Sequence, residues 1–217
     1  GTFTTDLTVN TLTIGRGAND ITTNTAVGAN VLDAVTTGGE NTSVGADSLT
    51  DNTSGAANSA FGRRALTDNT TGNNNVAVGG DSLFTNSTGS SNTAVGQNAL
   101  YSNTTASENA AFGYQSLYSN TTGSYNNAFG LDSLKANTTG AGNGAFGYRA
   151  LFSNTTGTRN FAFGNEALKA TTTGSYNNAF GRDALLSNTT GDDNTAIGHE
   201  ALKSNTTADS NVAIGKD

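Results

Sequence analysis

The chain has 217 residues, among them 28 glycines, and it contains no proline, cysteine, methionine or tryptophan. Only 12% of the residues are charged, 34% are hydrophobic, and the net charge of −7 is dispersed along the chain. This composition excludes disulfides and thiolate metal sites, a basic stripe for nucleic acid, and the ~20-residue apolar stretch needed for membrane insertion.

Residues 1–23 do not repeat and read as a short β segment. Leu7-Thr8-Val9 and Leu12-Thr13-Ile14 alternate apolar and polar side chains, which is typical of strands. Gly15-Arg16-Gly17 then turns the chain. We interpret 1–23 as N-terminal cap or junction strands that cover the open end of the repeats. The start at Gly1 and the lack of a similar cap at Asp217 lead us to expect a piece of a longer protein.

Residues 24–217 follow a 17-residue period without insertion or deletion. In each of twelve copies a Gly is preceded by an apolar residue, by Ala (once Ser) two positions earlier and by Asn four positions earlier. Leu follows four positions after the first eleven Gly residues, and a turn of the type Asn-Thr-Thr-Gly comes next. Structural positions in an early, a middle and a late copy are Asn24, Gly28, Leu32, Asn109, Gly113, Leu117, Asn194, Gly198 and Leu202.

A strict period means that every copy meets the same neighbours, which indicates a solenoid. Seventeen residues are too few for a pair of helices, and Val, Phe and Ile at the apolar position favour strand. The sequence therefore predicts an all-β fold, a parallel β-roll or β-solenoid of twelve 17-residue coils. We expect two strands of about four to five residues per coil, coils ~4.8 Å apart and a rod of roughly 55 Å.

The Asn residues before the apolar pair are predicted to stack into a ladder that bonds side-chain amides to one another and to the turn backbone. A second set of Asn residues lies in the turns and forms nine Asn-x-Ser/Thr sequences. These are Asn52, Asn69, Asn86, Asn103, Asn120, Asn137, Asn154, Asn188 and Asn205. Turn chemistry explains them, with N-glycosylation as the alternative.

Adjacent Ala111 and Phe112, and their equivalents, must point to opposite faces of a strand. Both positions hold small or apolar residues in every copy, so neither face suits water. One face can line the coil and the other needs a partner. We expect chains to associate about the rod axis with cyclic symmetry; the alternative is a monomer with a half-exposed face.

No constellation of residues predicts catalysis, a metal site or a cofactor. His199 is the only histidine, and it lies at a variable position that we read as solvent-exposed. Acidic residues recur two positions after the Gly, as at Asp183 and Glu200, but Arg64 and Arg149 share that position, which indicates a polar outer face. A calcium ion in a turn remains an alternative.

Aromatic residues follow the Leu in four copies, at Phe84, Tyr101, Tyr118 and Phe152. They are candidates for contact with a receptor, such as stacking on sugars, or for an inter-chain seam. Thr121 and Thr122 recur in most coils and leave ice binding as a further hypothesis, although adjacent Thr side chains would point to opposite faces. A polysaccharide-cleaving enzyme would require an acidic cleft that the variable positions do not show.

The segment Asn194-Thr195-Ala196-Ile197-Gly198-His199-Glu200-Ala201 resembles the YadA-like head repeats of trimeric autotransporter adhesins. Those repeats are nearer fourteen residues; the longer unit here, with the entry strands before it, looks more like the repeat region of bacteriophage tail fibres. The resemblance implies an intertwined homotrimer, extracellular on a virion or a bacterial surface. It implies a rigid phage tail-fibre shaft for host attachment, or alternatively an adhesin head. Implied partners are the chain itself, upstream and downstream fibre regions, and a cell-surface glycan or protein receptor.

Overall fold

The structure is a computed structural model that describes residues 7–10 and 12–216. Residues 1–6 and 11 of the expected N-terminal cap, and residue 217 of the expected repeat region, lie outside the described residues. Within the described residues the only helix is the short 3-10 turn η1 (Ala18–Asp20), so none could cross a membrane.

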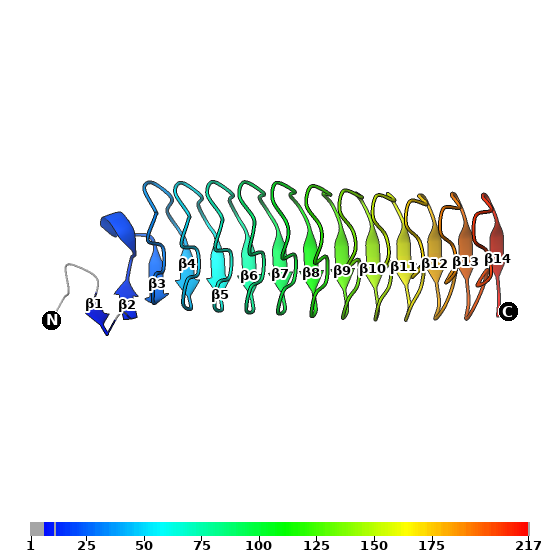
Figure 1. Cartoon of the computed structure of the whole chain (residues 1–217), viewed down its shortest axis with the longest axis horizontal. Coiled ribbons are helices and arrows are strands. Elements are labelled where there is room, and N and C mark those ends of the chain that lie inside the picture. Colours follow the sequence, from blue (N-terminus) through cyan, green and yellow to red (C-terminus); the bar gives the residue numbers. More distant parts are fainter. Residues whose placement is uncertain (1–6, 11, 217) are drawn as a thin grey trace.

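The chain winds into a straight stack of similar coils, each contributing one strand, and two N-terminal strands complete a single 14-stranded sheet (Figure 1). The strands are β1 (Leu7–Val9), β2 (Leu12–Gly15), β3 (Thr25–Gly28), β4 (Thr42–Val44), β5 (Ser59–Phe61), β6 (Val76–Val78), β7 (Thr93–Val95), β8 (Ala110–Phe112), β9 (Asn127–Phe129), β10 (Gly144–Phe146), β11 (Phe161–Phe163), β12 (Asn178–Phe180), β13 (Thr195–Ile197) and β14 (Val212–Ile214). From β3 to β14 every pair is parallel and in register, so that Ala111 faces Ala94 and Ala128. The predicted parallel β-solenoid is confirmed.

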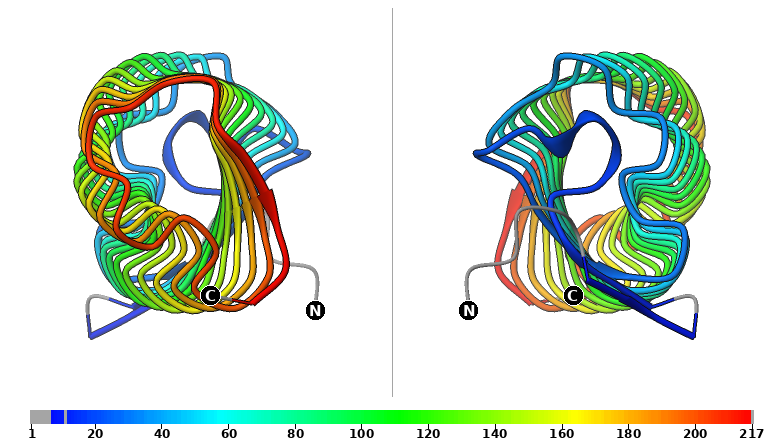
Figure 2. Two further views of the ribbon diagram at one scale, coloured as in Figure 1. Left: turned by 90° about the vertical axis from the view of Figure 1, so that its right-hand side faces the viewer. Right: turned by 90° about the vertical axis from the view of Figure 1, so that its left-hand side faces the viewer.

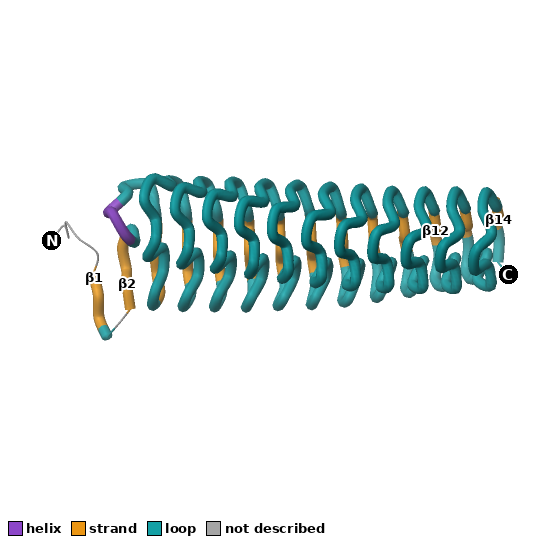
Figure 3. The backbone as a smooth tube through the Cα atoms, turned by 45° about the horizontal axis from the view of Figure 1, so that its top comes forward, coloured by secondary structure: helices purple, strands orange, loops and turns teal. Residues whose placement is uncertain are grey.

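The prediction of two strands per coil was wrong. Strands occupy one side of the rod only, and the rest of each coil is turn and loop (Figure 3). The Leu segment cannot form a strand because its backbone is left-handed at two positions. In the coil of Leu117, for example, Gln115 has φ 53° and Leu117 has φ 52°. Left-handed residues turn the chain sharply, which produces the rounded side of the coil seen along the rod axis (Figure 2).

The core is a column of Ala stacked beside a column of Leu. Ala111 points inward from its strand and is fully buried, and Leu117 is fully buried from the opposite arc of the coil. A left-handed Leu costs about 1–2 kcal/mol relative to the right-handed form. Full burial of the side chain stabilises by about 1.5–3 kcal/mol, and the Leu117 N–H also donates to Ser133 O in the next coil (3.0 Å).

The Gly that follows the strand of each coil is required for two reasons: its backbone angle, and the lack of space for a Cβ atom. Gly113 has φ 132°, and a Cβ there would lie 2.6 Å from Gly130 O in the next coil. The same close approach recurs from coil to coil.

At the N-terminal end, β1 and β2 form an antiparallel hairpin, and β2 pairs antiparallel with β3. The following turn covers the first coil: Ala18 N–H donates to Leu32 O (3.0 Å) and Asn19 Nδ2 donates to Val35 O (2.7 Å). Ala18 and Ile21 pack against the core. The segment thereby shields Leu32, which has no coil on that side.

Candidate functional site

The Asn residues before each strand form the ladder that the sequence predicts. The Asn109 N–H donates to Asn92 Oδ1 (3.0 Å), and Asn109 Oδ1 accepts from the Asn126 N–H (2.9 Å). Asn126 Nδ2 donates to Gly140 O in the turn of the next coil (2.8 Å). Asn24 and Asn194 occupy the same position: the Nδ2 of each donates to a carbonyl of the next turn, and the Oδ1 of each accepts from the N–H of the next ladder Asn. These residues are structural: their amides join strand to turn and coil to coil.

The turn Asn residues form a second, parallel ladder. Asn120 Nδ2 donates to Asn103 Oδ1 (3.1 Å) and to Gly123 O of its own turn (2.9 Å). From Asn52 to Asn188 these side chains are fully buried. Glycosylation attaches a bulky group to an exposed Nδ2, so the folded coils do not present these residues as acceptors. Turn and stacking chemistry accounts for the sequence pattern.

The outward-pointing apolar residue of each strand forms a continuous stripe along the sheet. We call it the outer apolar column: Val27, Val44, Phe61, Val78, Val95, Phe112, Phe129, Phe146, Phe163, Phe180, Ile197 and Ile214. Phe112 to Phe180 stack face to face with centroids 4.4–5.0 Å apart. Stacking covers their faces but leaves their edges in solvent; Phe129 is 36% exposed and Phe180 42%. The sequence prediction of one inward and one outward apolar position is confirmed.

The four aromatic residues after the Leu lie on the arc of the coil, and only three of them come together. Phe84, Tyr101 and Tyr118 stack with centroids 5.2 Å apart. Phe152 is separated from them because Lys135 occupies the intervening coil. Its ring lies under the Arg149 guanidinium (4.2 Å to the centroid). All four are half-buried, so the stack is partly used within the chain.

The acidic position two residues after the Gly is paired with basic groups along the same flank. Arg64 Nε lies 2.6 Å from Asp81 Oδ1 in the next coil, and Lys169 Nζ lies 2.8 Å from Glu166 Oε1 in the same coil. Hydrogen bonding to Asp81 raises the pKa of Arg64. The flank therefore carries ion pairs around Asp81 and again from Asp132 to Glu200, which agrees with the predicted polar outer face.

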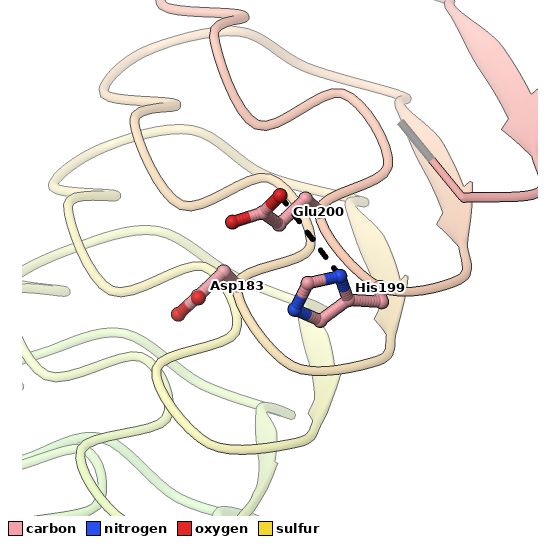
Figure 4. A group of neighbouring side chains, drawn as sticks. All are labelled: Asp183, His199 and Glu200. Atoms are coloured by element: carbon pink, nitrogen blue, oxygen red, sulfur yellow. Dashed lines mark ion pairs between the residues drawn. The ribbon is translucent and has the colours of Figure 1, made fainter.

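One cluster on this flank joins three residues whose meeting the sequence does not predict. Asp183, His199 and Glu200 place their ligand atoms within 4.8 Å of one another, on two successive coils (Figure 4). The carboxylates already have cationic partners: Arg182 Nε is 3.0 Å from Asp183, and Lys203 Nζ hydrogen-bonds Glu200. That bond lowers the pKa of Glu200 and raises the pKa of Lys203. A metal ion would have to compete with both cations, so the cluster favours ion pairing.

The sequence pattern names these three residues separately and indicates a polar outer face; Asp183 meets His199 and Glu200, which are 16 and 17 residues later, only through coil stacking. Once the coil period is known, residues two positions after successive Gly residues can be expected to lie one above the other.

Comparisons of the chain with protein families, with curated proteins and with solved structures found no match.

Proposed function

We propose that the chain is a rigid shaft segment of an extracellular attachment fibre, assembled as a parallel homotrimer around the outer apolar column. The observation that carries the proposal is the outward-pointing apolar side chain on every strand from β3 to β14, which is half-buried or exposed in each case. An unbroken apolar stripe of this length is unusual on a surface that faces only water.

Cyclic symmetry about an axis parallel to the rod suits this stripe. It would bring equal heights of each chain together, so that the Phe112–Phe180 segment meets the same segment of its neighbours and the Val segments meet Val. An antiparallel pair would instead oppose large and small side chains. Three sheet faces meeting at one axis would also remove the exposed edges of the Phe rings from solvent.

The mechanical role follows from the stacking. Successive coils are bound by strand hydrogen bonds, by apolar columns and by two Asn ladders, of which the turn ladder is interrupted at Thr171. Such a rod transmits force and holds whatever is attached at its ends at a fixed distance. A phage tail-fibre shaft used in host attachment is our first candidate, and an adhesin head on a bacterial surface is the second.

An ice-binding surface is less well supported. Thr121 Oγ1 donates to Thr138 O in the next coil (3.1 Å), and the equivalent hydroxyls do the same in other coils. Only the neighbouring column, which contains Thr122, is exposed. A flat surface with two free Thr columns is therefore not available on this turn.

Light scattering of the purified chain tests the assembly. We expect three times the chain mass for the wild type, and a monomer with an unchanged circular dichroism spectrum for the double variant Phe129→Asp, Phe163→Asp. Thr122→Asp, which adds a carboxylate to the exposed turn, should remain trimeric. A monomeric wild type, or a charged double variant that stays trimeric, would contradict the proposal.

The biological setting has a separate test. Sequencing the coding region around these repeats should reveal either phage structural genes, often with a chaperone domain after the fibre, or a membrane anchor typical of autotransporters. If neither kind of neighbouring gene is found, the fibre assignment loses its support.

A further inference from the structure

A surface column beside the sheet changes character in its middle. We call it the rim column, and it consists of the residue before each ladder Asn from Asn41 onward: Glu40, Ala57, Asn74, Ser91, Glu108, Tyr125, Gly142, Arg159, Tyr176, Asp193 and Ser210. Every member has a positive φ, between 55° and 70°. Small or polar residues suit this conformation, whereas large side chains such as Tyr are uncommon in it. Two tyrosines with this backbone therefore call for an explanation.

Tyr125 and Tyr176 are unusually exposed as well as conformationally unusual. Tyr125 is 60% exposed and Tyr176 is 46% exposed. Both belong to the same local sequence, Gly-Ser-Tyr-Asn-Asn-Ala-Phe-Gly, three coils apart. They lie on either side of Gly142 and Arg159 in the rim column. Four successive coils therefore present an aromatic ring, no side chain, a guanidinium and an aromatic ring at this position.

Gly142 leaves a gap in the rim column because it has no side chain. A Cβ at Gly142 would meet only Arg159 Cγ, at 3.5 Å. The resulting depression has a volume of about 460 Å³ and is lined by Tyr125, Ala141, Gly142, Thr158, Arg159 and Tyr176. With coils about 4.8 Å apart, the backbones that carry Tyr125 and Arg159 are separated by about 10 Å. That spacing leaves room for one ring-shaped group between the two side chains.

Arg159 differs from the other described arginines in having no carboxylate partner. Arg16, Arg63, Arg64, Arg149 and Arg182 each lie within 4.0 Å of an Asp or Glu. Arg159 instead donates through Nη1 to Tyr176 Oη (2.8 Å), and its guanidinium lies 5.4 Å from the Tyr176 ring centroid. Tyr176 thus orients the guanidinium without neutralising it, on a chain whose net charge is −7.

We propose that the depression at Gly142, which we call the slot, binds one acidic pyranose unit of a glycan. The apolar face of the sugar ring stacks on Tyr125, the ring occupies the rung left open by Gly142, and the sugar carboxylate pairs with the Arg159 guanidinium. An arginine–carboxylate pair supplies directed, charge-assisted hydrogen bonds, and an exposed aromatic face supplies the stacking surface. Thr158 also lines the slot, and its hydroxyl already donates to Ser175 Oγ in the next coil (3.5 Å). A neutral sugar would lack the ionic contact.

The proposal names a receptor class for the proposed fibre and rests on that function for its biological role. Binding itself does not require trimer formation. The light-scattering mass and the glycan affinity are independent readouts, so failure of one is distinguishable from failure of the other.

Calorimetric titration of the purified chain with galacturonic acid tetrasaccharide and sialyllactose tests the slot, with their carboxyl-reduced forms as neutral comparisons. We expect weak saturable binding of at least one acidic probe and at least about tenfold weaker binding of its neutral form, equivalent to about 1.4 kcal/mol. Arg159→Gln should lose about the same factor. Arg182→Gln, which removes an exposed arginine that is already paired with Asp183, should bind like the wild type.

A side chain placed at Gly142 gives a second test that should not disturb the fold. Gly142→Asn places in the slot the residue that Asn74 carries at the same position of the rim column, with the same backbone conformation. It should retain the wild-type melting temperature and lose binding. Absence of binding by both acidic probes, equal affinity for the neutral forms, or full binding by Gly142→Asn would overturn the proposal.

Discussion

At the scale of single residues, the turn Asn ladder has an informative break at Thr171. Asn154 Oδ1 is buried and has no hydrogen-bond partner, because the next coil offers Thr171 in place of Asn. Thr171 Oγ1 instead donates to Asn188 O (3.1 Å). An intact rung, such as Asn137 Nδ2 to Asn120 Oδ1 (2.8 Å), satisfies the acceptor below it.

Thr171→Asn should therefore stabilise the chain. The new amide would donate to Asn154 Oδ1 and to its own turn, and its Oδ1 would accept from Asn188. An unsatisfied buried acceptor costs about 1–3 kcal/mol, so we expect a gain within that range. Urea unfolding monitored by circular dichroism measures it. The reverse change, Asn137→Thr, should lower the free energy of unfolding by a similar amount, and equal stability of the two variants would contradict the ladder argument.

Asp68 is a residue whose charge opposes folding. Burial raises its pKa above the ordinary 3.8, and the Asp51 carboxylate adds to the shift. Asp51 and Asp68 occupy the same position in successive coils, so the stacking that aligns the Asn ladders also aligns two like charges.

Because its pKa is raised in the folded state, folded Asp68 binds its proton more tightly than the unfolded chain does. Its contribution to stability must then fall as the pH rises from about 3.8 through the folded pKa, and recover on acidification. Asp68→Asn should be more stable than the wild type at neutral pH, and the difference should vanish below pH 3.8. Thermal unfolding of both chains across this pH range measures the difference. A gain that persists unchanged in acid would point to a cause other than the charge.

At the scale of the coil, two Gly positions look alike in the sequence but differ in the structure. Gly113 closes the strand with φ 132°, whereas Gly123, in the turn, has no positive φ. Both approach a carbonyl of the next coil. The turn position nevertheless holds Ala at Ala106, which has a coil stacked on it, so the turn can shift to accept a methyl group.

We accordingly expect Gly113→Ala to lower the free energy of unfolding by about 3 kcal/mol or more, because strain at positive φ adds to a backbone clash. Gly123→Ala should cost less than about 1 kcal/mol. Denaturant unfolding of the two variants side by side provides the measurement. Similar losses in both would show that the close approach, and not the backbone angle, determines the requirement for Gly.

Much of the coil could be predicted from the repeat itself. The period, the inward Ala, the outward apolar residue and the Asn ladders follow from which positions stay constant. The left-handed Leu could not be predicted, because Leu disfavours that conformation and is held there by its burial and by coil-to-coil hydrogen bonds. The slot at Gly142 could not be predicted either, since it is lined by six variable residues that become neighbours only when coils stack.

At the scale of the whole molecule, each coil contacts mainly the coils before and after it. The sheet pairs only sequential strands from β1 to β14. In such an array the stability is close to a sum of coil terms and neighbour terms. The columns, however, require that every coil return to the same angular position after 17 residues, which explains why no copy carries an insertion or a deletion.

Removal of one complete period should therefore be tolerated. Deleting residues 114–130 joins Gly113 to Leu131, restores every column, and should yield a folded rod shortened by about 4.8 Å. Deleting residues 115–130 instead leaves an 18-residue coil, because one residue fewer is removed. The extra residue must bulge outward and pull the adjacent rungs of the Asn ladders out of alignment. We expect this second deletion to be less stable than the first by about 2 kcal/mol or more. Small-angle scattering measures the length of the rod, and denaturant unfolding measures its stability. Equal stability of the two deletions would mean that the coils tolerate misalignment of their columns.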